Sequence, residues 1–82
     1  MEKNIYTQRQ RILLELLREI RRKAKLRQED VAAQLDRPQS FVSKYESGER
    51  RLDILELRDV CEALGMTLVE FAKRLERKLA SS

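Results

Sequence analysis

The chain has 82 residues, with 18 Lys and Arg against 14 Asp and Glu, no His and a single Cys. One cysteine cannot form an internal disulfide, and a chain without His or clustered Cys lacks the usual zinc-binding and His-activated nucleophile motifs. No apolar run approaches the roughly 20 residues that a membrane helix needs. We therefore expect one cytoplasmic domain without a catalytic site, metal, cofactor, membrane contact or small-molecule ligand.

The positive charge is concentrated in the first third of the chain. Residues 1–26 carry eight Lys and Arg against three Glu, whereas residues 27–52 carry five charges of each sign and residues 53–82 carry five against six. The overall charge of +4 suits a nucleic-acid partner but does not prove one. The basic residues near the N-terminus either contact phosphates or form a solvated face.

A long amphipathic helix is predicted from about Thr7 to Lys25, and residues 1–6 are expected to form an arm. Thr7 is a plausible N-cap. Apolar residues at the three- and four-residue spacing of a helix form the expected core face: Ile12, Leu13, Leu16, Leu17, Ile20 and Ala24. Leu14 widens this stripe, which is a weak indication of contact with a second subunit.

The segment at 27–46, RQEDVAAQLDRPQSFVSKYE, predicts two short helices joined by a tight turn. The apolar faces are Val31, Ala32 and Leu35 in the first helix, and Phe41, Val42 and Tyr45 in the second. Pro38 suits the first position of the second helix, and Gly48 suits a left-handed cap at its end. Because so short a turn forces the helices to cross steeply, the pattern predicts a helix-turn-helix, whose second helix can enter a DNA major groove.

Polar side chains cover the remaining surface of that second helix. They are Gln39, Ser40, Ser43 and Lys44. Gln and Ser can read base edges, and Lys can reach guanine or phosphate. Phe41 either touches a thymine methyl group or fills the space beside Tyr45. The pattern alone equally allows a helical hairpin with a solvated polar face.

Two further helices are predicted, each opened by a capping box. The first box is Asp53 to Glu56, and the second is Thr67 to Glu70. The inward face of the earlier helix consists of Leu57, Val60, Cys61 and Leu64, and a buried Cys61 is favoured over a reactive thiol. Residues 80–82 are expected to form a short tail.

The last helix carries an apolar seam among many charged residues. Phe71, Leu75 and Leu79 form this seam. Such a seam suits dimerisation with a second copy of the chain. The alternative is that the seam only packs on neighbouring helices of the same protomer.

Three stretches resemble the lambda-repressor/Cro-type helix-turn-helix family, the xenobiotic-response-element-like transcriptional regulators. They are IRRKAKLRQEDVAAQL at 20–35, RPQSFVSKYESGERRLD at 37–53 and LRDVCEALGMTLVEF at 57–71. The resemblance covers about two-thirds of the chain. It implies a compact all-α bundle of five helices within residues 7–79, with the helix-turn-helix at the second and third helices. It also implies sequence-specific binding of double-stranded DNA by a homodimer on an inverted-repeat operator, with repression as the expected action.

The resemblance also assigns roles to single residues. Arg21 and Glu46 are expected to form a structural ion pair that fixes the angle of the reading helix, unless both are solvated. Gln28 is expected to contact a DNA phosphate and to brace Gln39. Arg27 departs from the usual Ser or Thr cap, so its helix is expected to start less firmly, with a phosphate contact by Arg27 as an alternative role.

One residue after the first short helix departs from the family pattern, and two arginines follow the second short helix. Asp36 stands where the family usually has Gly, although Asp tolerates left-handed backbone angles better than most residues. Arg50 and Arg51 follow the reading helix and are predicted to hold phosphates beside the groove.

The competing hypothesis is an antitoxin-like module that binds a partner protein, with DNA binding secondary, but only residues 78–82 look spare for that purpose.

Overall fold

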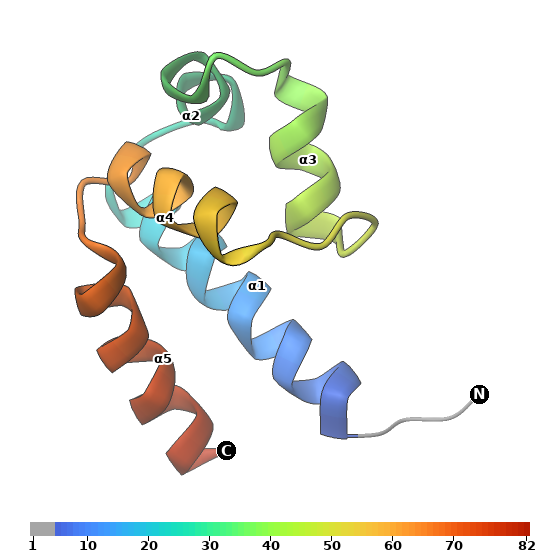
Figure 1. Cartoon of the computed structure of the whole chain (residues 1–82), viewed down its shortest axis with the longest axis vertical. Helices are drawn as coiled ribbons and strands as arrows, with labels where there is room; N and C mark the ends of the chain where they lie inside the picture. Colours follow the sequence, from blue (N-terminus) through green and yellow to red (C-terminus); the bar gives the residue numbers. More distant parts are fainter. Residues whose placement is uncertain (1–4) are drawn as a thin grey trace.

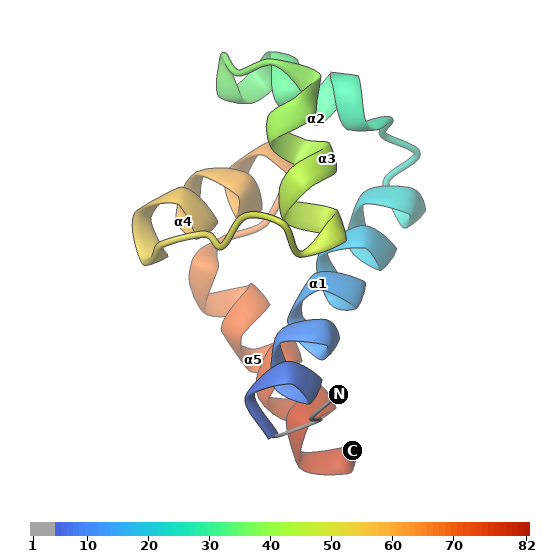
Figure 2. The same cartoon turned by 90° about the vertical axis from the view of Figure 1, so that its right-hand side faces the viewer.

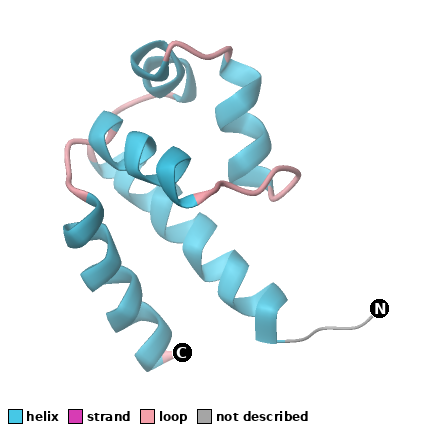
Figure 3. Cartoon of the chain, viewed as in Figure 1, coloured by secondary structure: helices cyan, strands magenta, loops and turns pink. Residues whose placement is uncertain are grey.

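The structure, a computed structural model, describes residues 5–82, with side chains from residue 7 onward. Five helices follow one another, and no strand occurs in this described range (Figure 3). They are α1 (Ile5–Lys23), α2 (Gln28–Leu35), α3 (Gln39–Ser47), α4 (Ile54–Ala63) and α5 (Leu68–Ser81). The predicted all-α fold with its helix-turn-helix at α2 and α3 is confirmed. None of the helices described is long and apolar enough to cross a membrane.

The two longest helices form one end of the bundle, and the three short ones form the other. α5 packs alongside α1, and α2 packs against both α3 and α4 (Figure 1). α4 also packs against α5, and α3 packs against α1. Figure 2 shows α3 in front, with α2 behind its upper end and α1 beside its lower end. One side of α3 therefore faces the core while the other side faces solvent.

Side chains from all five helices meet in the core. The fully buried members are Leu16, Leu17, Val31, Val42, Tyr45, Val60, Cys61 and Phe71. Burying one such apolar side chain stabilises a protein by about 1.5–3 kcal/mol. Cys61 is buried as predicted, and burial raises the pKa of its thiol to about 11. The three- and four-residue spacing of apolar residues in the sequence thus marks the helix faces that pack inward.

Both predicted capping boxes are present. Asp53 Oδ1 accepts a hydrogen bond from the Glu56 N–H at 2.8 Å, and Glu56 Oε1 accepts one from the Asp53 N–H at 3.0 Å. Thr67 and Glu70 exchange the corresponding bonds at 3.1 and 2.9 Å. Each box satisfies two N–H groups that a helix start leaves without an intrahelical acceptor.

The turn between α2 and α3 depends on a left-handed residue. Asp36 has φ 56° and ψ 44°, and its N–H donates to the carbonyls of Ala32 and Ala33. This confirms that Asp can replace the usual Gly here. Pro38, with φ −68° and ψ 155°, is the N-cap of α3, one residue earlier than predicted. Gly48 caps the end of α3 with φ 89°, as predicted.

The structure corrects several predicted boundaries. α1 begins at Ile5, so Thr7 lies inside the helix, and of the predicted arm only residues 1–4 remain, outside the described residues. α5 continues to Ser81, so the expected tail is mostly helical. Leu14 is buried and packs against Gly48 at the end of α3, because the helix end reaches over that face of α1. Because Leu14 packs within the protomer, it no longer indicates contact with a second subunit.

Tyr45 is the largest fully buried side chain, and its hydroxyl has no hydrogen-bond partner in the described part of the chain. Burial raises the pKa of this phenol well above its usual range, so the group stays neutral. A buried polar group without a partner costs about 1–3 kcal/mol. The ring of Tyr45 therefore stabilises the core while its hydroxyl opposes that effect.

We expect Tyr45→Phe to raise the free energy of unfolding by about 1 kcal/mol, because it removes the unsatisfied hydroxyl and keeps the ring. Tyr45→Ala is the matched control and should lower the free energy of unfolding by about 3–5 kcal/mol because the ring is removed. Urea denaturation followed by circular dichroism measures both. A loss of stability in Tyr45→Phe would show that the hydroxyl has a partner.

Candidate nucleic-acid interface

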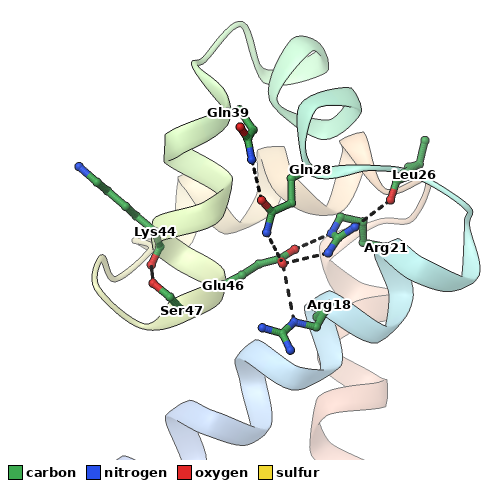
Figure 4. Close-up of polar contacts among 8 residues, drawn as sticks. All are labelled: Arg18, Arg21, Leu26, Gln28, Gln39, Lys44, Glu46 and Ser47. Atoms are coloured by element: carbon green, nitrogen blue, oxygen red, sulfur yellow. Dashed lines mark hydrogen bonds and ion pairs between the residues drawn. The ribbon is translucent and has the colours of Figure 1, made fainter.

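The exposed side of α3 carries the four predicted base-reading residues. Gln39, Ser40, Ser43 and Lys44 are all exposed, because Phe41, Val42 and Tyr45 fill the opposite side of the helix. The side chains of Ser40, Ser43 and Lys44 make no hydrogen bond or ion pair with the rest of the described chain. Lys44 points away from the domain (Figure 4). The structure therefore brings these residues together on one polar, solvated face.

A buried ion pair joins α3 to α1. Arg21 Nε donates to Glu46 Oε2 at 2.6 Å, and Arg21 Nη2 donates to Glu46 Oε1 at 3.0 Å (Figure 4). The two side chains are 11% and 2% exposed. Arg21 also donates to the Leu26 carbonyl at 2.9 Å. The hydrogen bonds to Glu46 raise the pKa of Arg21, so the guanidinium remains charged.

Two glutamine amides extend this network to the start of the reading helix. Gln28 Nε2 donates to Glu46 Oε1 at 2.9 Å, and Gln39 Nε2 donates to Gln28 Oε1 at 2.8 Å (Figure 4). An ionised carboxylate can only accept hydrogen bonds, so Gln28 must turn its NH₂ group toward Glu46 and its oxygen toward Gln39. Gln28 thus braces Gln39, as the resemblance implied, and the charge of Glu46 sets the orientation of both amides.

Arg27, at the start of α2, is held by neighbouring carboxylates. Its guanidinium donates to both Asp30 oxygens at 3.1 Å and lies 3.5 Å from Glu29. The Arg27 N–H also donates to Asp30 at 2.7 Å. These hydrogen bonds lower the pKa of Asp30 and raise that of Arg27. As expected from its departure from Ser or Thr, Arg27 forms no side-chain cap hydrogen bond, but Asp30 accepts the Arg27 N–H and binds its guanidinium at the start of α2.

Arg50 belongs to a group that we call the Glu56 cluster, made of Arg37, Phe41, Arg50 and Glu56. Arg50 donates to both Glu56 oxygens at 2.9 and 2.8 Å, and Arg37 Nη2 lies 3.6 Å from the same carboxylate. The hydrogen bonds from Arg50 are the largest cause of the shift that lowers the pKa of Glu56 to about 2. The carboxylate therefore stays ionised at any physiological pH.

Phe41 lies beneath both guanidinium groups of the cluster. The Arg37 and Arg50 guanidinium carbons lie 4.4 and 4.8 Å from the centre of its ring, within the range of a cation–π contact. The ring also packs edge-on against Tyr45, with 5.6 Å between the ring centres. Because only 7% of Phe41 is exposed, it fills the space beside Tyr45, and no thymine contact is available to it.

Arg51 is the predicted phosphate-binding arginine whose side chain forms no ion pair with the described residues. Its side chain is exposed and lines a hollow of about 370 Å³ between α1 and the end of α3, together with Arg11 and Arg18. Arg18 Nε also lies 3.8 Å from Glu46. Two of the basic residues predicted in α1, Arg11 and Arg18, thus lie beside the end of α3.

The predicted dimerisation seam is largely used within the protomer. Phe71 is completely buried, so it offers no surface to a partner, because it faces the core where α5 meets α1 and α4. Leu75 is half-buried and packs against the same core. Leu79 is half-buried and lines an open hollow of about 750 Å³ with Ile12. The structure therefore excludes Phe71 from an interface and leaves only part of Leu75 and Leu79 accessible.

The family model for the helix-turn-helix, HTH_3, matches residues 17–71, which contain the whole Glu46 network and the exposed polar face of α3. The chain belongs to this helix-turn-helix family. As a member it is a DNA-binding transcriptional regulator.

Known relatives and structures agree with this assignment. The regulator is 34% identical over 56 residues to the control protein C.MunI of a Mycoplasma species, covering 68% of this chain and 76% of the relative. It is similar to the structure of an XRE-family-like protein from Pseudomonas syringae pv. tomato str. DC3000, with 45% identity, a TM-score of 0.84 and 89% of each chain covered. The restriction-modification controller protein C.Esp1396I shares the fold, with a TM-score of 0.83 at 20% identity over 98% of this chain and 100% of that one.

Sequence reasoning missed the Glu56 cluster in this regulator. It treated Glu56 only as the second member of a capping box and Arg37 only as a turn residue. Nothing in the spacing shows that residues on both sides of α3 reach one carboxylate on α4. The weak signal available was the pair of arginines that bracket the reading helix, at positions 37 and 50.

We expect Arg21→Met and Glu46→Gln each to lower the free energy of unfolding by about 3–5 kcal/mol, because each leaves a buried partner without its counter-charge. The double variant should lose less than the sum of the two, with a coupling of about 1–3 kcal/mol. The exposed pair Arg58 and Glu62, 3.6 Å apart, is the control and should couple by less than about 0.5 kcal/mol. Chemical denaturation measures all variants. Additive losses at Arg21 and Glu46 would contradict a structural role for the pair.

Proposed function

We propose that this regulator reads its operator as a homodimer in the cytoplasm, with α3 lying in the major groove of each half-site. The observation that carries the proposal is the polar, exposed face of α3, a helix whose other side is buried and which the Arg21–Glu46 ion pair joins to α1. A helix held in this way can enter a groove without rearrangement of the domain.

Each reading residue has a chemistry that suits base edges. Gln39 gives one N–H to Gln28, which leaves its oxygen and its second N–H for adenine N6 and N7. Lys44 is suited to guanine O6 and N7, and Ser40 and Ser43 can accept or donate. These four residues therefore supply the sequence-specific part of the interaction.

Phosphate contacts are proposed mainly for Arg51 and Gln28. Arg51 follows the reading helix without an ion-pair partner in the described chain, and Gln28 lies at the N-terminus of α2, where unpaired N–H groups favour an anion. Arg27 and Arg50, which the sequence also suggested, are bound to carboxylates in the free protein. They would contact a phosphate only by exchanging those partners.

The proposed dimer uses exposed apolar residues of α4 and α5. Ile54, Leu55 and Val69 are 63%, 70% and 64% exposed, which is high for large apolar side chains. Ile54 and Leu55 begin α4 directly after the loop that follows α3, so a twofold axis here would bring the two reading helices close to the axis. A spacing of about 34 Å between them would match half-sites one DNA turn apart.

We expect selection of bound sequences from random DNA to recover an inverted repeat. Lys44→Ala should relax the preference at one base pair per half-site and weaken the selected site by about 1–3 kcal/mol. Arg51→Gln is the control and should weaken all sequences alike, while lowering the salt slope of log K by about 0.9 for each phosphate that is no longer neutralised. Unchanged affinity and specificity in Lys44→Ala would remove α3 from the role of reader.

We expect Leu55→Glu and Val69→Glu to shift the protein toward monomer, because each places a charge in the proposed apolar interface. Sedimentation equilibrium over a range of protein concentrations measures the shift. Ala80→Glu is the control, since Ala80 is exposed on the far end of α5. Dissociation by Ala80→Glu alone would instead place the interface at the end of α5 near Leu79.

A further inference from the structure

Two arginines bracket the reading helix, and one carboxylate binds both. Arg37 precedes α3 by two residues and Arg50 follows its last residue by three, yet both guanidiniums lie over Phe41 within α3. Glu56 on α4 holds Arg50 through two hydrogen bonds and lies 3.6 Å from Arg37. Both positive groups are therefore drawn against the side of α3 that faces α4.

The side of a reading helix is where a DNA backbone lies. The major groove is about 12 Å wide, so phosphates line both sides of a helix inside it. An unpaired arginine beside α3 would be within side-chain reach of those phosphates, and each such contact adds affinity that is independent of base sequence. Arg37 and Arg50 remain 45% and 38% exposed, so neither is sterically prevented from turning outward.

We propose that Glu56 limits sequence-independent DNA binding, because it restrains Arg37 and Arg50 so that they do not contact DNA phosphates. The inference rests on the proposed placement of α3 in the groove. A phosphate contact strengthens binding to every DNA sequence alike, so this restraint lowers the affinity for non-operator DNA without changing which bases are read. Arg51, which makes no such pair among the described residues, is left to contact the backbone.

The local role of Glu56 can be separated from this long-range one. Its Oε1 accepts the Asp53 N–H in the capping box, and a Gln oxygen at the same position can accept that bond. Glu56→Gln therefore keeps the start of α4 and removes only the charge that holds the two arginines. Glu70 is a matched residue, since it occupies the same position in the capping box of α5. No Lys or Arg of the described chain lies within ion-pair distance of Glu70.

The first test compares Glu56→Gln with Glu70→Gln for binding to a labelled duplex of random sequence between about 50 and 200 mM salt. Both variants gain the same net charge and keep a capping box. We expect Glu56→Gln to bind roughly three- to tenfold tighter than Glu70→Gln and to steepen the salt slope of log K by about 1–2, because one or two more phosphates are neutralised. Equal or weaker binding by Glu56→Gln would overturn the proposal.

The second test leaves Glu56 intact, so it does not depend on the stability of that variant. The double variant Arg37→Gln and Arg50→Gln should change the salt slope by less than about 0.5, because restrained arginines do not contact DNA. A fall of about 1–2 would show that both already bind phosphates and would overturn the proposal. Selection from random DNA separates this failure from a failure of the proposed function, since Lys44→Ala reports on α3 alone.

Discussion

The buried carboxylate of Glu46 is the interaction on which the proposed interface depends. It joins α3 to α1 through Arg21 and joins α3 to α2 through Gln28, so three helices meet at one side chain that is 2% exposed. Because an ionised carboxylate only accepts, it also determines which atom of each glutamine faces outward. The same charge thus joins α3 to two other helices and, through Gln28, orients the amide of Gln39 at the start of α3.

The basic residues near the interface divide into restrained and free groups. Arg21, Arg27 and Arg50 each form close hydrogen bonds with a carboxylate, whereas Lys44 and Arg51 form none in the described chain. The net charge therefore does not show which positive side chains are unpaired. That depends on where the acidic partners lie among the described residues.

The fold was largely predictable because its signals are local. The apolar spacing, both capping boxes and the left-handed residues at Asp36 and Gly48 depend only on neighbours in the chain. The reading face was predictable for the same reason, since burial of one side of α3 leaves the other exposed. The Glu56 cluster and the burial of Phe71 and Leu14 were not predictable, because they depend on how distant helices pack. Arg21 and Glu46 were identified in advance only through the family resemblance.

Asp36, at the position where the family usually has Gly, affects the unfolded chain as well as the folded turn. A residue with a side chain in the left-handed region costs about 1–2 kcal/mol, but it visits far fewer backbone states than Gly in the unfolded chain. The turn between α2 and α3 therefore loses less backbone entropy on folding than it would with Gly, which offsets part of the cost of the left-handed conformation.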